Sequence, residues 1–90
     1  MNYEPVSEAY ERLISRAVIK HAIKDVGGSN RHKQRAANNY FSSPIFSVHC
    51  ENAGYPSELL DSLKELSVLS QAQRYVSAKA ILRTLDEEWK

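Results

Sequence analysis

The spacing of apolar residues between Pro5 and Val26 is the feature that most limits what this chain can fold into. Every fourth residue there is apolar, in the series Val6, Tyr10, Ile14, Val18, Ala22 and Val26. The series two residues out of phase is basic throughout: Arg12, Arg16, Lys20 and Lys24. Residues four apart share a face of an α-helix, whereas residues two apart lie on opposite sides. The pattern therefore predicts one long helix whose apolar row packs obliquely on a neighbouring helix and whose cationic row faces solvent.

Glycine and proline divide the chain at only a few points. Gly27-Gly28 is expected to end the first helix in the left-handed conformation, which other residues avoid. Ser43-Pro44 is typical of an N-cap followed by the first helical residue, and Gly54 is expected to end the helix that begins there. In that helix Ile45, Phe46 and Val48 are expected to reach the core.

The remaining segments also read as helices. A helix is predicted over Arg31–Phe41, with Ser29 or Asn30 as its N-cap, and another over Pro44–Glu51. A further helix is predicted to begin at Pro56, with one apolar face made of Leu59, Leu60, Leu63 and Leu66. The last is predicted over Gln71–Glu88, after a capping box formed by Ser70 and Gln73. In the last segment a seam is predicted from Val68, Tyr75, Leu82 and Trp89, with Ala78 and Leu85 between them. Trp89 is expected to pack on the core. The only strand-like segment, 45–50, has no partner strand, so the fold class is all-α, with four or five short helices in one compact array.

Composition sets the broad class of protein. A chain of 90 residues with 42% hydrophobic and 26% charged residues is expected to form a single domain over 1–90. No apolar run is long enough to span a membrane, and the polar start after Met1 is unlike a signal peptide, so we expect a cytoplasmic protein. The single cysteine, Cys50, cannot form an internal disulfide, so stability must come from the hydrophobic core.

No pattern in the sequence indicates catalysis. Paired carboxylates, phosphate-binding loops and nucleophile motifs do not occur. His49 and Cys50 are adjacent, and because neighbouring residues of a helix point about 100° apart, His49 is not placed to activate the thiol. His21 and His32 stand alone, without the spacing of metal ligands. We predict a protein without catalytic residues, metal or cofactor, in which Cys50 is a small buried apolar side chain.

Charge gives the clearest functional indication. Residues 1–35 carry seven Lys and Arg against four acids, whereas residues 36–90 carry five against seven. The candidate binding residues are Arg12, Arg16, Lys20, Lys24, Arg31, Lys33 and Arg35, which together could form one positive surface. A protein partner and a nucleic acid both remain open, as does a purely solvated helix face. The isoelectric point of 7.9 is low for a nucleic-acid-binding domain, so we rank the protein partner first.

Two parts of the chain resemble small proteins of unknown function encoded by phages and prophages. They are residues 10–25 (YERLISRAVIKHAIKD) and residues 41–46 (FSSPIF) together with 55–60 (YPSELL). The resemblance implies a shared helical fold and brings no catalytic residue. It also implies a host protein as the partner, such as a defence nuclease of the kind that anti-CRISPR inhibitors bind, in the host cytoplasm. The net charge of +1 argues against DNA mimicry. Homodimerisation through the seam of Val68, Tyr75, Leu82 and Trp89 is a further hypothesis.

Overall fold

The computed structural model describes residues 4–89 and confirms the all-α prediction. The helices are α1 (Glu4–Gly27), α2 (Arg31–Phe41), α3 (Pro44–Ala53), α4 (Glu58–Glu65), the short 3₁₀ helix η1 (Leu66–Val68) and α5 (Gln71–Glu88). No strand occurs within this described range. The predicted boundaries differ from the observed ones by about two residues at most. Side-chain caps begin α2 and α5, whereas α3 and α4 begin without a side-chain cap hydrogen bond.

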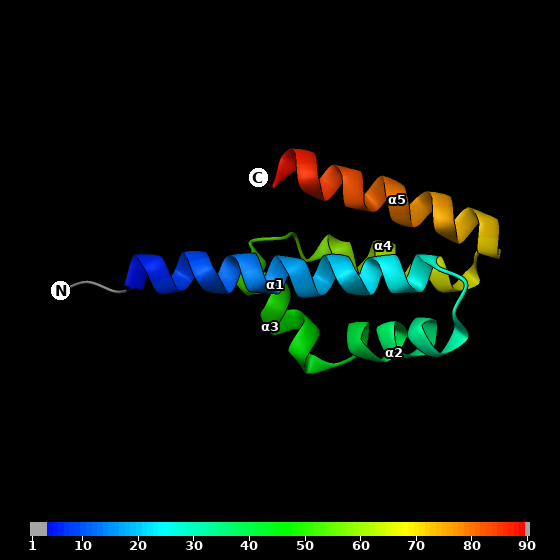
Figure 1. Ribbon diagram of the computed structural model, residues 1–90, viewed down its shortest axis with the longest axis horizontal. Coiled ribbons are helices and arrows are strands. Elements are labelled where there is room, and N and C mark those ends of the chain that lie inside the picture. The colour runs from blue at the N-terminus through cyan, green and yellow to red at the C-terminus, as the bar shows by residue number, and fades with distance from the viewer. Residues whose placement is uncertain (1–3, 90) are drawn as a thin grey trace.

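The helix α1 is the axis around which the other helices assemble. In Figure 1, α5 runs antiparallel to it on one side, α2 and α3 lie on the other, and α4 passes behind it. The first turns of α1 reach beyond the remaining helices, and the molecule measures 51 × 25 × 20 Å. The other helices therefore pack against the middle and the C-terminal part of α1.

Residues from all five α-helices form the hydrophobic core. It contains Ile19, Ile23 and Val26 of α1, Phe41 of α2, Phe46 and Cys50 of α3, Tyr55, Leu59, Leu63 and Leu66 around α4, and Ala78 and Leu85 of α5. Phe41 and Phe46 meet edge to face with ring centroids 5.2 Å apart, and Tyr40 contacts both rings. Burial of Cys50 agrees with its predicted role as a small apolar residue.

The apolar row of α1 is not the buried row, which corrects the sequence prediction. Tyr10, Ile14 and Val18 are exposed, whereas Ser15, Ile19 and Ile23 are buried. Residues four apart advance by about 400°, so the row turns by about 40° at each step. It faces the core at Val26 and has turned to the opposite side by Tyr10. Val6 lies among the residues whose side chains are not described.

The predicted left-handed conformation is found at one of the two glycine joints and not at the other. Gly54, not Gly27 or Gly28, is the glycine with a left-handed backbone, at φ +74°, and it caps α3 as predicted. Gly27 lies within α1, and a Cβ on it would stand 2.6 Å from the Cβ of Ala78. Gly27 therefore allows α1 and α5 to approach closely, and this contact between distant segments is invisible in the local sequence.

Several apolar residues predicted to be buried lie on the surface. Ile45 and Val48 are exposed while Phe46 is buried, because α3 presents only one face to α1. Val68 and Tyr75 of the predicted seam are exposed too, since the small Ala78 forms the close contact of α5 with α1. Trp89 packs on the core as predicted, with its ring edge-on to Tyr55 at 6.2 Å. The capping box at Ser70 and Gln73 is confirmed.

Candidate functional site

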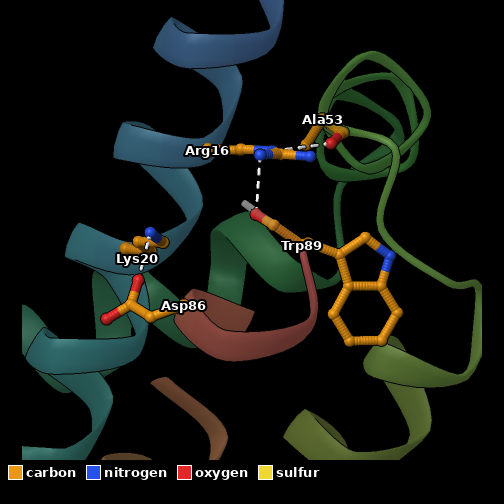
Figure 2. Close-up of polar contacts among 5 residues, drawn as sticks. All are labelled: Arg16, Lys20, Ala53, Asp86 and Trp89. Atoms are coloured by element: carbon orange, nitrogen blue, oxygen red, sulfur yellow. Dashed lines mark hydrogen bonds and ion pairs between the residues drawn. The ribbon is translucent and has the colours of Figure 1, made fainter. Parts of the chain in front are cut away.

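The seven candidate cations do not form one continuous surface. Arg12 is exposed. Arg16 and Lys20 are half-buried and turn toward the C-terminal end of α5 (Figure 2). Since these two interrupt the row between Arg12 and Lys24, the predicted basic ridge along α1 is broken at its centre.

Arg16 fastens three parts of the fold together. Its Nε donates to the carbonyl oxygen of Ala53 at 2.9 Å, and Nη1 donates to that of Trp89 at 2.7 Å. Its guanidinium also lies 5.4 Å from the centre of the Tyr55 ring. Ala53 and Trp89 stand at the C-terminal ends of α3 and α5, where carbonyls lack helical partners and the helix dipole favours a cation. The sequence pattern contains no signal for this role, because Arg12 has the same chemistry one turn earlier.

Lys20 and Lys24 also differ in their surroundings. The Nζ of Lys20 forms an ion pair with Asp86, an acid in the last turn of α5. Lys24 is exposed and lines a cavity of about 240 Å³ together with Lys79 and Tyr75 of α5. The Nζ of Lys79 lies 5.2 Å from the Tyr75 ring centre. Two of the four cations of α1 are thus occupied by contacts within the fold.

The cations of α2 have no such contacts. Arg31, Lys33 and Arg35 are all exposed, and none of them forms an ion pair with another residue of the described range 4–89. No acidic residue occurs anywhere in α2. Arg31 and Arg35 lie four residues apart and share one face of the helix, while Lys33 lies about 200° round the helix from Arg31. Among the predicted residues, the structure brings Arg31 and Arg35 together.

Arg31 and Lys33 occupy positions that weaken the helix that carries them. They are the first and third residues after the N-cap Asn30, whose side chain accepts a hydrogen bond from the Lys33 backbone N–H at 3.0 Å. The N-terminus of a helix carries partial positive charge, so a cation there is unfavourable by about 0.3–1 kcal/mol. An amphipathic helix that merely needed solubility would place acids in this turn.

The start of α2 is nonetheless held firmly in place. Gln34 donates to the carbonyl oxygen of Gly28, which also accepts from Nε2 of Gln71 at 2.8 Å. These contacts tie the first turn of α2 to the end of α1 and the start of α5. The positions of Arg31 and Arg35 on the surface are therefore set by the fold and not by the local segment alone.

The one thiol lies in a poor environment for nucleophilic chemistry. Burial raises the pKa of Cys50 from 9.0 to about 11, so the thiol stays protonated near neutral pH. His49 bonds elsewhere, with Nδ1 2.6 Å from the hydroxyl oxygen of Tyr40. Burial also raises the pKa of Tyr40 to about 12, with the charge of Cys50 adding to the shift.

Residues 4–89 contain no group of three or more His, Cys, Asp or Glu side chains able to hold a metal ion. None of the helices described is long and apolar enough to cross a membrane.

Comparison with known proteins returns no match to a family model, to a curated protein or to a solved structure. The resemblance to small phage and prophage proteins therefore stays a prediction.

Proposed function

We propose that this protein is a non-enzymatic interaction protein that binds an acidic surface of a partner protein through the Arg31 and Arg35 face of α2. The observation that carries the proposal is the placement of exposed, unpaired cations in the first turns of a helix without any acid. Arg31 lies in the first turn, where a cation costs the helix stability, and Arg35 extends the same face by one turn. The resemblance noted in the sequence makes a host protein the class of partner to test first.

A protein partner fits this surface better than a nucleic acid does. Nucleic-acid affinity at physiological salt comes from many phosphate contacts, on the order of six to ten in well-studied cases. Here the face offers two arginines, and the α1 row that would have extended it is interrupted at Arg16 and Lys20. Arginine is well suited to paired hydrogen bonds with a carboxylate, so a few contacts to an acidic patch suffice for recognition.

Affinity capture from host lysate, with and without nuclease, tests the class of partner. We expect a captured protein that survives nuclease treatment and is released by raised salt, because the contact is electrostatic. Release by nuclease, together with duplex affinity that falls linearly with salt on a log–log scale, would instead establish the nucleic-acid alternative.

A pair of variants with equal charge change tests the site. Arg31→Gln with Arg35→Gln removes the shared face, and we expect affinity for the captured partner to fall by roughly tenfold or more. Lys33→Glu alters the net charge by the same amount on the other side of α2, and should leave affinity within about twofold. Lys33→Glu should also raise the free energy of unfolding by about 1 kcal/mol, since an acid replaces a cation near the positive helix end. Equal losses of affinity in both proteins would contradict the proposed face.

A further inference from the structure

The outward side of α1 carries an apolar stripe that no other helix covers. Tyr10 and Leu13 are each 66% exposed, Ile14 is 47% exposed and Val18 is 39% exposed, with the exposed Ala17 between them. Their spacing is i, i+3, i+4, i+7 and i+8, which is the spacing of a helix face that packs on another helix. In the described part of the chain this face has no partner.

The stripe lies on the opposite side of α1 from the core. Ser15, Ile19 and Ile23 face the other helices, and the centre of the stripe is displaced from them by roughly half a turn. In Figure 1 the first turns of α1 extend beyond α2, α3, α4 and α5, and no other helix passes in front of α1, so there is room for a second helix along it. A helix with two apolar sides has more apolar surface than this fold alone can bury.

We propose that the occupant of this stripe is a second copy of the chain, with the two α1 helices packed antiparallel. The proposal goes beyond the proposed function and does not depend on it. Two such stripes brought together would bury on the order of 1,000 Å² in all, which is at the lower end of specific interfaces. A weak and reversible dimer is the expected result.

The residue sizes along the stripe favour this antiparallel arrangement. With the two-fold axis between Leu13 and Ile14, Tyr10 of one copy lies level with Ala17 and Val18 of the other. The largest side chain then faces the smallest, which is the alternation that lets two helices interlock. Antiparallel helices also place the two bodies at opposite ends, so they do not crowd each other. Glu11 lies about 100° round the helix from the centre of the stripe and Arg12 lies on the opposite side of α1, so neither must be buried.

Sedimentation over a range of protein concentrations tests for the dimer. We expect wild type to pass from monomer to dimer with Kd in the micromolar to high-micromolar range. Leu13→Asp should raise Kd at least roughly tenfold, because a twofold interface contains each substitution twice. Val76→Asp is the matched control: Val76 is 65% exposed on α5, away from the stripe, and its loss should leave Kd unchanged. Wild type that stays monomeric at about 1 mM, or equal effects of the two variants, would overturn the proposal.

Disulfide cross-linking tests the direction of packing. Ile14→Cys lies next to the two-fold axis and should cross-link to its counterpart under mild oxidation. The two copies of Val18→Cys should not, because in an antiparallel pair they stand about 13 Å apart along the axis. A parallel pair would cross-link both variants, and this result would refute the antiparallel arrangement. The buried Cys50 makes wild type the background control.

Discussion

Replacing Arg16 by methionine should destabilise the protein strongly, although the side chain lies on a helix that looks uniformly basic on that side. The substitution removes the hydrogen bonds to the carbonyl oxygens of Ala53 and Trp89 and the stacking on Tyr55. A hydrogen bond to a charged group contributes about 1.5–3 kcal/mol, and the half-buried position lets water replace part of that. We therefore expect a loss of about 2–4 kcal/mol, a large part of the 5–15 kcal/mol typical of a domain.

Urea denaturation of wild type and variant measures this loss. Because unfolding exposes the same surface, the midpoint should fall while the slope stays constant. Arg16→Lys should recover only part of the stability, since an ammonium cannot reproduce the planar fork of two donors. The matched control is Arg12→Met, one turn earlier and exposed, which we expect to change stability by less than about 0.5 kcal/mol. If the two methionine variants unfold at the same urea concentration, Arg16 does not fasten the helix ends and the reasoning fails.

Two further predictions concern the contact of α1 with α5 and the buried thiol. Gly27→Ala should lower the free energy of unfolding by about 1–3 kcal/mol, because the new Cβ would stand 2.6 Å from the Cβ of Ala78. Adding Ala78→Gly should recover part of this loss, which a double-mutant cycle of thermal or urea unfolding would measure. For Cys50, the pKa is raised from 9.0 to about 11, so the unfolded chain releases this proton first as pH rises. The stability that Cys50 contributes should be complete below about pH 9 and should fall between about pH 9 and pH 11. Urea midpoints measured over this pH range should show the fall, and Cys50→Ala should lessen it. An unchanged alkaline slope in Cys50→Ala would contradict this cause.

The order of the helices was predictable because local chemistry determines where each begins and ends. Ser70 and Gln73 satisfy each other's backbone groups, Asn30 caps α2, and Gly54 takes the left-handed conformation after α3. These interactions involve residues a few positions apart, so a single sequence contains the information. The left-handed conformation predicted at Gly27 was wrong. Gly27 is instead a point of close contact with Ala78, which is remote in the chain and therefore absent from the local pattern.

The candidate site was predictable only as a set of residue types. Arg12 and Arg16 are equivalent in the sequence pattern, yet one is exposed and the other joins the ends of α3 and α5. Lys20 and Arg35 are likewise similar in sequence, but only Lys20 meets an acid of the last helix. Which cations are free depends on contacts between residues far apart in the chain, and these contacts exist only after folding.

By itself, the sequence determined that this chain is helical, where its helices start and stop, and that its first half is the more basic one. Backbone hydrogen bonds and caps act over a few residues, so helix formation and helix boundaries do not depend on tertiary contacts. Tertiary structure decided which side of α1 is buried and which cations remain for a partner. Those outcomes depend on where α3 and α5 end in space, because a helix with apolar residues on two sides can bury only the side that other helices reach.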